Sequence, residues 1–554
     1  MRKGFRKLVL SVCSLVTALS LSLPFSACAK WDEWMSATSS SSVREPLEPL
    51  EPIEPLPLPP APMPMPEPEP EPEPPPTPTP EPEPEPEPTP EPAPIPEPTP
   101  SEPDPNKTVE RTETDEIGHK IAHYTDGTKE DLGRAVALDF STPLPSEQYG
   151  YNYFATLEIG TGLQAFYDEM YTLCTEFHDS EREVTDSNRI IGKIIYAEKG
   201  LTLEQAYAVW SIFRKENPAY FWVDNSLLKD SAYLHIRIEA DYVAYADRLY
   251  TQRAIETFAL DCDRYVSTLT TETERALTVY DYLIEKIEYA YESDGVTAED
   301  ATWAHNAAGG ALYGLGVCET YAETYDYFCG LFGLECLNVT GLAGDFSSTD
   351  NYGRHAWNVV EIDGVWYTID ATWGDAKYLS RQWFGKSATE FAETHRAYSP
   401  ESGWGMDYQY TLPTLSESAS SPVAVWEENG EATMYISLDK AFQTMTIAAG
   451  RYEINLYPQT KISKETGAVI HGDGASFSAP LPTVASLTFI GLRVELEDGE
   501  YALAKLNTDT DVTLAGNVTL ENVIWSVRTL EKSGYMLTTK GEGSKVEETY
   551  GVLE

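Results

Sequence analysis

The chain has 554 residues, which at about 150 residues per domain predicts three or four units. Its 89 acidic residues outnumber 39 basic ones, and the net charge of −50 excludes nucleic acid as the default partner because phosphate binding requires the opposite sign. Hydrophobic residues make up 42% of the chain and aromatic residues 11%, so a wholly disordered protein is excluded as well.

Segment 1–27 has the three-part pattern of a secretory signal peptide. Four basic residues come first, an apolar stretch runs from Leu8 to Leu23, and small residues precede Cys28. The pattern predicts an exported, extracellular protein. Phe25 to Cys28 also resembles the bacterial lipobox, which implies lipidation of Cys28 and anchoring to the cell membrane, with simple secretion as the alternative. No other apolar run approaches the ~20 residues that a membrane span needs.

Segment 28–106 holds the lipid-anchor site and a linker rich in proline and glutamate. Between Pro46 and Pro105 lie 30 of the 40 prolines of the chain, interleaved with glutamates. Proline fixes φ and removes amide donors, and like charges repel, so this segment cannot form a core. We expect either an extended polyproline II stalk, which at ~3.1 Å per residue reaches roughly 190 Å, or a disordered acidic spacer.

Segment 107–270 is predicted to be a helix-rich domain with some strand, although its first part, to about Gln148, has no readable pattern. Apolar residues from Leu163 to Phe177 recur at helical spacing and include Cys174, which favours a core role for this thiol. A second helix opens with the capping-box pattern Thr202 to Gln205 and ends near Pro218. Alternation from Tyr233 to Ile238 predicts a strand.

The next domain, 271–414, opens with a predicted helix from Thr271 and contains the residues that could carry chemistry. Cys318 follows glycine-rich sequence and precedes an apolar periodic run that ends at Gly333. We therefore place Cys318 at a helix N-terminus, where free amides and the helix dipole favour a thiolate over a thiol of pKa ~8.5. Cys329 falls on the packed side of the same helix and is interpreted as core.

A hairpin follows, and its register can be predicted. Asp363 and Gly364 form the pair preferred in two-residue type I′ turns, between two apolar strands. Such a turn pairs Ile362 with Val365 and makes His355 and Asp370 diagonal neighbours on one face, provided that no bulge interrupts the ladder.

These three residue types fit nucleophilic acyl transfer. Cys318 would attack a carbonyl carbon, His355 would exchange protons with the sulfur and the leaving amine, and Asp370 would orient His355. The backbone amide of Cys318 would be one oxyanion donor, and Tyr313 and Asn306 are candidates for the other. The alternative is a buried cysteine, a surface histidine and a turn aspartate with no common role.

Three sequence blocks resemble the transglutaminase-like superfamily, a papain-like cysteine fold, in its bacterial form. G-V-C-x-x-Y-A matches 316–322, H-A-W-N matches 355–358, and D-G-x-W-Y-x-x-D-x-T-W matches 363–373, within a similarity that covers roughly 275–375. The resemblance implies an α+β core with Cys318, His355 and Asp370 as a catalytic triad that needs no cofactor. Thr320 stands where the bacterial relatives usually have glycine, which puts substrate access near the nucleophile in question.

The resemblance leaves the reaction open, because the superfamily includes cross-linkers, amide hydrolases, proteases and inactive binding modules. Trp357 and Trp373 could line an acyl groove, although packing in the family core is the alternative. His119 and His123 are four residues apart, but they sit in polar sequence and are interpreted as surface residues. We therefore expect no metal site.

The last segment, 415–554, is predicted to be an all-β domain, either a β-solenoid or a sandwich. Helical periodicity vanishes there, and short alternating runs separated by turn residues take its place. The expected strands are 434–436, 445–447, 452–456, 487–490, 512–514 and 518–520.

The sequence as a whole predicts a multidomain cell-surface cysteine enzyme that acts on protein or peptide amides. A catalytically inactive binding or scaffold module with the same fold is the alternative. A cell-wall polymer is a further candidate partner. The seven cysteines are too few for a disulfide scaffold, and the pairing of Cys174, Cys262, Cys329 and Cys336 stays open.

Overall fold

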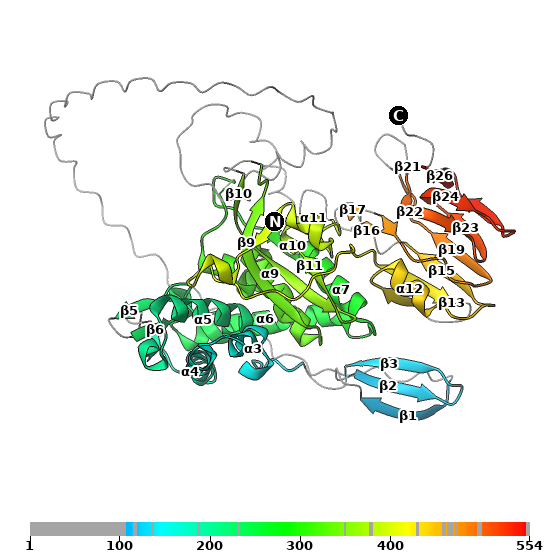
Figure 1. Ribbon diagram of the computed structural model, residues 1–554. Coiled ribbons are helices and arrows are strands. Elements are labelled where there is room, and N and C mark those ends of the chain that lie inside the picture. Colours follow the sequence, from blue (N-terminus) through cyan, green and yellow to red (C-terminus); the bar gives the residue numbers. More distant parts are fainter. Residues whose placement is uncertain are drawn as a thin grey trace, which may run out of the picture.

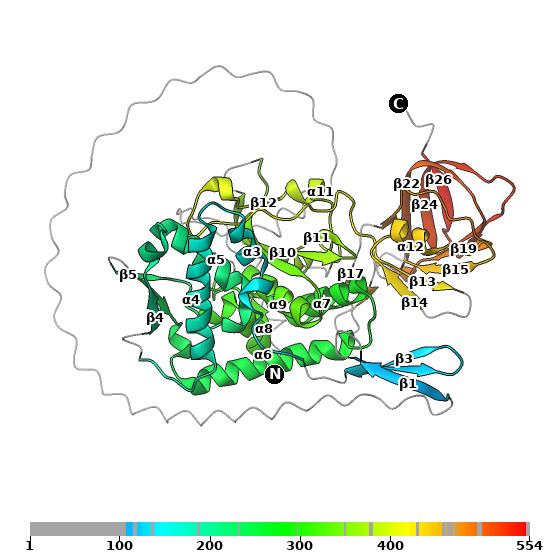
Figure 2. The same cartoon turned by 60° about the horizontal axis from the view of Figure 1, so that its bottom comes forward.

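The computed structural model describes residues 107–114, 119–134, 138–185, 189–230, 233–295, 297–347, 351–375, 380–427, 432–456, 461–462, 469–470, 474–495 and 501–549. The signal peptide, Cys28 and the proline-rich linker lie outside these ranges. Among the helices within them, none combines the length and the apolar character needed to cross a bilayer. Figures 1 and 2 show a central body of helices around a sheet, with a β-rich tail at one side.

The described chain begins with a three-stranded antiparallel sheet, in the segment where the sequence showed no pattern. Its strands are β1 (Val109–Thr114), β2 (His119–Tyr124) and β3 (Lys129–Arg134), in that order. The sheet stands apart from the central body in both views (Figures 1 and 2). Its buried cluster contains only Ala122 and Tyr124, with Val109 packed against them. A core this small explains the lack of a hydrophobic signal.

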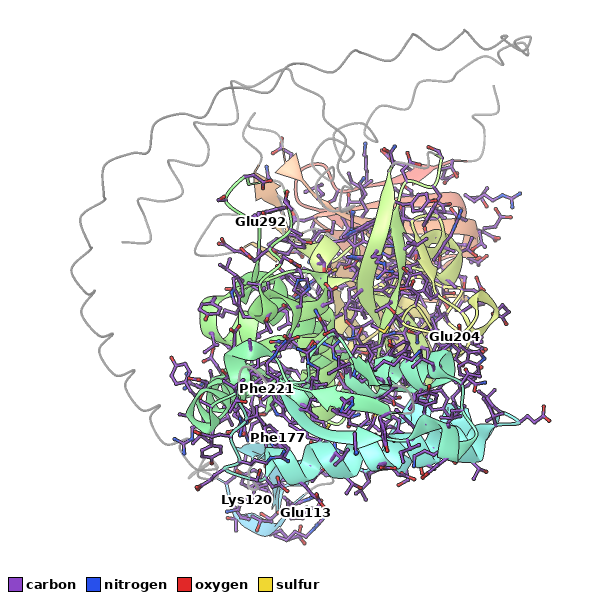
Figure 3. The ribbon with its side chains drawn as sticks, turned by 90° about the vertical axis from the view of Figure 1, so that its left-hand side faces the viewer. Glu113, Lys120, Phe177, Glu204, Phe221 and Glu292 are labelled. Carbon is purple, nitrogen blue, oxygen red and sulfur yellow. The ribbon has the colours of Figure 1, made fainter. Side chains whose placement is uncertain are left out.

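The helix-rich segment follows. It comprises α3 (Tyr149–Ala155), α4 (Gly160–His178), α5 (Leu203–Glu216), α6 (Tyr245–Val266) and an antiparallel sheet of β4 (Ile190–Ile194), β6 (Tyr233–Arg237) and β5 (Leu228–Asp230). The predicted apolar face of α4 is buried, and it includes Cys174. Thr202 caps α5 by accepting from the Gln205 amide, so the predicted capping box is confirmed. Phe177 and Phe221 lie within this part (Figure 3).

The longest helix, α6, had no counterpart among the sequence predictions. Its buried face is partly polar, since it contains Arg248, Thr251 and Asp263 beside Ile255 and Ala259. The Arg248 guanidinium donates to the Tyr242 carbonyl oxygen at 2.8 Å and lies 4.3 Å from the Phe177 ring centroid. Tertiary contacts of this kind satisfy polar groups that would otherwise oppose burial. Because part of the buried face is polar, the sequence of α6 shows no apolar stripe, and the helix was not predicted.

The central domain places helices on a four-stranded antiparallel sheet ordered β11, β10, β9, β12. The strands are β9 (Cys336–Gly344), β10 (Tyr352–Ile362), β11 (Val365–Ile369) and β12 (His395–Ala397), and the helices are α7 (Glu272–Lys286), α8 (Ala307–Tyr313), α9 (Cys318–Leu331), α10 (Ala371–Gly374) and α11 (Ala388–Ala392). A short parallel pair joins β7 (Glu288–Tyr289) to β8 (Leu315–Gly316). The Asn358 side-chain amide donates to the Ala322 carbonyl oxygen at 2.9 Å, which fixes α9 against β10.

Short 3₁₀ turns connect many of these elements. They are η3 (Pro145–Glu147), η4 (Tyr196–Lys199), η5 (Pro218–Tyr220), η6 (Ala240–Tyr242), η7 (Thr302–His305) and η8 (Pro400–Ser402).

One hydrophobic cluster crosses the boundary expected at residue 270. It contains Phe154 and Trp210 of the helix-rich segment together with Val339 and Trp357 of the sheet. A second cluster joins α7 and α9 to the β10–β11 hairpin, and it also contains Ile436 of the tail. The helix-rich segment and the sheet therefore bury apolar surface against each other.

The tail is rich in β structure. Its strands are β13 (Val423–Glu427), β14 (Ala432–Tyr435), β15 (Arg451–Asn455), β16 (Lys461–Ile462), β17 (Val469–Ile470), β18 (Ala475–Ser476), β19 (Ser486–Ile490), β20 (Val494–Glu495), β21 (Tyr501–Ala502), β22 (Ala504–Thr513), β23 (Asn517–Glu521), β24 (Val523–Glu531), β25 (Leu537–Lys540) and β26 (Lys545–Glu548). Strands β15, β19, β23 and β25 pair in parallel, and so do β18, β22, β24 and β26.

Two details of the tail correct the sequence prediction. Residues 438–444 form a helix, α12 (Leu438–Thr444), capped by Ser437, which accepts from the Lys440 amide. The expected strand 445–447 is wrong, because Met445 is the C-cap of that helix and packs with Leu438 and Phe442 in the tail core. A helix of two turns shows too few periodic positions to stand out among alternating strands.

Candidate active site

Cys318 is the first residue of α9, so its predicted position at a helix N-terminus is confirmed. Val317 before it is extended, and Cys318 itself is 7% exposed. The side chain packs in a small cluster with Ala322, one turn along the helix, and with Ala356 of β10. The Cys318 side chain therefore packs against β10 at Ala356, the residue that follows His355.

Thr320 and Gly316 explain how the chain turns into α9. Thr320 is fully buried, and its hydroxyl donates to the Ala304 carbonyl oxygen at 2.6 Å. A Cβ at Gly316 would lie 2.3 Å from the Thr320 Cβ, so only glycine fits there. Thr320 thus packs inward against η7, and the concern that it restricts substrate access near Cys318 is not supported.

The hairpin has the predicted register. Ile362 pairs with Val365 and Asn358 with Ile369, and no bulge interrupts the ladder between β10 and β11. Asp363 and Gly364 have φ values of 54° and 79°, as a type I′ turn requires. The regular ladder brings His355 and Asp370 to the same face at the open end of the hairpin.

His355 and Asp370 are in direct contact. The His355 Nε2 lies 3.0 Å from the Asp370 Oδ2, and both side chains are buried. The other carboxylate oxygen, Oδ1, accepts from the Trp373 amide at 3.0 Å and caps α10. Burial alone would raise the pKa of Asp370, but the charge and hydrogen bond of His355, with the hydrogen bond of His395, hold it below its ordinary value. Asp370 is therefore a charged, oriented acceptor.

His395 is a second histidine on the same carboxylate, and sequence reasoning missed it. Its Nε2 lies 3.0 Å from the Asp370 Oδ2, and the Thr394 hydroxyl lies 2.9 Å from its Nδ1. Burial lowers the pKa of His395 to about 4, against the opposing effect of Asp370. The neutral ring thus donates from Nε2 to Asp370 and accepts at Nδ1 from Thr394. His395 comes from β12, which pairs with β9, outside the motif blocks.

Aromatic rings surround the two histidines. The Trp373 centroid lies 5.7 Å from that of His355 and 4.4 Å from that of His395, and Trp357 lies 6.1 Å from His355. Phe391 stacks on His395 at 3.9 Å. Trp357 and Trp373 are 3% and 7% exposed. Their position favours packing around the imidazoles over the lining of an open groove.

We expect His395→Phe to lower kcat/KM about tenfold, because Asp370 loses one of its hydrogen-bond donors and orients His355 less firmly. Phenylalanine fits the same aromatic surroundings, so the melting temperature should change little. If His395 positions Asp370, the acid limb of the kcat/KM pH profile should shift to higher pH, because the charged form of the Asp370 carboxylate is less well stabilised in the variant. His178→Phe, at a partly buried histidine against Trp222, is the matched control, and equal effects of both variants would contradict the assignment.

Glu319 is a further neighbour of the nucleophile. The Cys318 Sγ lies 3.0 Å from the Glu319 Oε2, and His305 Nδ1 lies 3.7 Å from the other oxygen. Partial burial raises the pKa of Glu319, but the hydrogen bond and charge of His305 outweigh this and lower it to about 2. His305 in turn has a raised pKa, because Glu319 and Asp300 outweigh the effect of burial. A carboxylate beside the sulfur favours the thiol over the thiolate.

Glu319→Gln is therefore expected to speed alkylation of Cys318 at pH 7 by about three- to tenfold, since it removes a like charge. The measurement is the rate of iodoacetamide labelling of Cys318 as a function of pH. Glu323→Gln is the control: partial burial raises the pKa of Glu323 to about 8, so that substitution changes little charge at pH 7. Slower labelling in Glu319→Gln would show that Glu319 assists the sulfur instead.

Of the two candidate oxyanion donors, Asn306 has a role in a helix cap and Tyr313 is largely exposed. Asn306 caps α8, accepting from the Ala308 amide at 2.9 Å and donating to the carbonyl oxygens of Thr302 and Phe221 at 3.2 and 3.4 Å. Tyr313 is 55% exposed and packs on Trp303 at the far end of α8. Asn306 is therefore best explained as a structural cap.

Potential metal ligands gather around the Asp370 carboxylate. Within the described ranges, one group of three, His355, Asp370 and His395, has ligand atoms within 4.8 Å of one another. A metal ion at this position would be bound by the same atoms whose hydrogen bonds orient His355. Metal binding and the orientation of His355 by Asp370 therefore exclude each other.

His123 is 8% exposed and lies 2.7 Å from the Glu113 carboxylate in the small N-terminal sheet, so the expectation of a surface position is wrong for this residue.

Comparisons with known proteins point to one superfamily. A family model described as the transglutaminase-like superfamily matches residues 262–371, a range that contains Cys318, His355 and Asp370. Kyphoscoliosis peptidase from Homo sapiens is 26% identical over 169 residues, which is 29% of this chain and 24% of that protein. The Mus musculus protein is 26% identical over 165 residues, with the same shares.

The match is thus confined to one region, and the chain spans about a quarter of the length of these curated relatives. Among solved structures, the crystal structure of a TGase aligns with 34% of this chain and 53% of its own, at 14% identity and a TM-score of 0.22.

Proposed function

We propose that this chain, whose residues 262–371 match the transglutaminase-like superfamily, is a cysteine enzyme that transfers or hydrolyses acyl groups of protein or peptide amides. The observation that carries the proposal is the buried contact of the His355 Nε2 with Asp370 at 3.0 Å, on a strand whose next residue, Ala356, packs with Cys318 at the start of α9. Nucleophile, base and orienting carboxylate are the parts that such chemistry needs.

Asp370 holds the His355 Nε2, so proton exchange with the sulfur goes through Nδ1. Cys318 passes its proton to that nitrogen, and the sulfur forms a bond to the amide carbonyl carbon. The C–N bond then breaks, and His355 returns the proton to the leaving amine, which leaves a thioester on Cys318. Water or a primary amine resolves the thioester and restores the thiol.

The first amides of α9 support the developing negative charge. Backbone N–H groups in the first turn of a helix have no partner within the helix, and the helix dipole favours an anion there. The Cys318 amide is at this position and would be one oxyanion donor.

The proposal extends to the location of the enzyme and the form of its tail. An exported protein with a lipid on Cys28 and a proline-glutamate stalk would hold the catalytic domain away from the membrane. The parallel pairing in the tail supports a β-solenoid that faces a cell-wall polymer or another surface partner. Retention of radiolabelled palmitate by the wild-type protein and its loss in Cys28→Ala tests the anchor.

A second candidate function is a non-catalytic surface binding module that keeps the fold. The contact between Cys318 and Glu319 favours it, because a neighbouring carboxylate disfavours the thiolate on which catalysis depends.

Alkylation at pH 7 separates the two candidates. Cys336 is more exposed than Cys318, and burial raises its pKa well above the usual range. An activated Cys318 should be labelled at least tenfold faster than Cys336 despite its lower accessibility, and equal or slower labelling would refute the enzyme.

Ammonia release from glutamine peptides, with and without an added primary amine, then separates hydrolysis from cross-linking. Amine-independent cleavage of the peptide backbone would identify a protease.

A further inference from the structure

Glu319 is a charged side chain in contact with the proposed nucleophile. The Cys318 thiol donates to its Oε2, which lies 3.0 Å from the Sγ. Cys318 is buried, whereas the Glu319 side chain is 46% exposed. A substrate group that reaches the sulfur from solvent therefore comes close to this carboxylate.

Two further side chains hold the Glu319 carboxylate in this direction. The His305 Nδ1, on η7, lies 3.7 Å from Oε1, which leaves Oε2 to the sulfur. The other ring nitrogen of His305 lies 3.9 Å from the exposed carboxylate of Asp300. Two carboxylates and one imidazole keep a net negative charge whether or not His305 is protonated.

The helix dipole by itself does not account for the contact with the sulfur. The dipole stabilises an acidic residue in the first turn of α9, but it does not require the carboxylate to face Cys318. The contact makes the thiolate less stable, which opposes the first step of the proposed reaction. A positively charged group on the substrate would relieve the repulsion between the carboxylate and the thiolate.

Acylation of Cys318 changes the surroundings of Oε2. When the thioester forms, the thiol proton has passed through His355 to the leaving amine, so the sulfur has no hydrogen left to donate. Oε2 then lies beside the thioester as a charged acceptor that has lost its Sγ donor. An ammonium or guanidinium group can replace that donor through a charge-assisted hydrogen bond, which is stronger than a hydrogen bond from a thiol.

The basic side chains of the described residues leave this position open to a substrate. Among those residues, the ion-pair partner of Glu319 is His305, which lies at the other carboxylate oxygen. The charge of Arg214 acts on Glu319 only at longer range, and its guanidinium lies 5.2 Å from the Trp210 ring centroid.

We propose that Glu319 is a specificity-determining residue, which selects substrates that bring a positively charged nitrogen group to Cys318. This inference rests on the proposed function, because it concerns the substrates that react at this sulfur. The cation has two sources with the same chemistry: a basic side chain beside the reactive amide of the acyl donor, or the ammonium form of an acceptor amine.

An acceptor held as ammonium must lose two protons. The first goes to solvent, which gives the neutral amine. Its nitrogen then bonds to the thioester carbon, the C–S bond breaks, and the second proton passes through the His355 Nδ1 to the sulfur of Cys318.

Charged thiol reagents test this selection without turnover. The cationic 2-aminoethyl and the anionic 2-sulfonatoethyl methanethiosulfonates each form a mixed disulfide with a thiolate and release methanesulfinate. The measurement is the rate at which each reagent modifies Cys318 in the full chain at pH 7, followed by mass spectrometry of the peptide that contains it. Both rates depend on the same thiolate fraction, so their ratio reports the charge beside the sulfur.

We expect the cation-to-anion rate ratio to fall about tenfold in Glu319→Gln, which removes the charge and keeps the shape of the side chain. It should fall further in Glu319→Lys. Glu323→Gln, one turn along the same helix, should keep the ratio of the parent protein. An unchanged ratio in Glu319→Gln would overturn the inference.

Substrate assays then identify the source of the cation. Glutamine peptides with Lys, Ala or Glu next to the glutamine, assayed with the largely uncharged acceptor hydroxylamine, test the acyl donor. The Ala peptide assayed with 1-aminopentane or hydroxylamine tests the acceptor. The cationic partner should have the higher kcat/KM in one of the two comparisons, and Glu319→Gln should reduce that advantage about tenfold.

The outcomes separate this inference from the proposed function. An active enzyme with no preference for either cationic partner, or with a preference that survives Glu319→Gln, would overturn the role of Glu319. A chain that consumes no peptide but still shows the charge-dependent modification of Cys318 would refute the enzymatic activity alone, and the charge selection at the sulfur would stand.

Discussion

Cys318→Ala is expected to abolish amide cleavage and acyl transfer, with a loss in kcat of about 10⁴-fold or more, as for the removal of other catalytic nucleophiles. No other described thiol stands at a helix N-terminus beside the His355 strand, so no group can replace the sulfur. Alanine fills most of the site between Ala322 and Ala356, so the fold should persist. Activity per folded molecule is the measurement, with folding followed by circular dichroism.

Cys329→Ala is the matched control, on the same helix. Cys329 is fully buried in the core between α7, α9 and the hairpin. Its loss should cost about 1–2 kcal/mol of unfolding free energy through the cavity left behind, with unchanged kcat. Retained activity in Cys318→Ala, or an equal loss in both variants, would contradict the assigned nucleophile.

Asp370→Asn is expected to lower kcat by about 10³- to 10⁴-fold through the wrong histidine tautomer, as in other triads. In the wild-type protein the Trp373 amide donates to the Asp370 Oδ1 at 3.0 Å, which caps α10. An asparagine that keeps this cap must place its side-chain oxygen in the position of Oδ1. Its NH₂ group then faces the Nε2 atoms of His355 and His395, which both lie 3.0 Å from Oδ2. The His355 proton moves to Nδ1, which can no longer accept the thiol proton.

The labelling rate of Cys318 is the second readout for this variant. Without the Asp370 charge, the imidazolium form of His355 is less stable, so iodoacetamide labelling at pH 7 should slow in parallel with kcat. Stability should also fall, because the variant removes the charged acceptor that both buried imidazoles contact through Nε2. A variant that melts earlier but keeps both rates would show that Asp370 serves only the fold.

Acid should also weaken the fold through Asp370. Its folded-state pKa is held below the ordinary value, so its stabilising contribution is present above pH ~4 and is lost as the pH falls through the folded-state pKa.

Features set by near neighbours in the sequence were predictable. The capping boxes of Thr202 and Thr271 start α5 and α7, because each side chain reaches an amide only three residues away. Asp363 and Gly364 determine the type I′ turn, and the period of two then determines which residues share a face with His355. The contact between His355 and Asp370 follows from these local rules.

Tertiary structure decided what depends on distant segments. His395 reaches Asp370 because β12 pairs with β9, and α6 is buried through polar residues that only its neighbours satisfy. The sequence by itself therefore determined the nucleophile, its partner and the hairpin between them, because short-range geometry specifies those. The contacts of His395 with the site could be known only from the packed fold, because burial and the pairing of distant strands determine its charge and its partners.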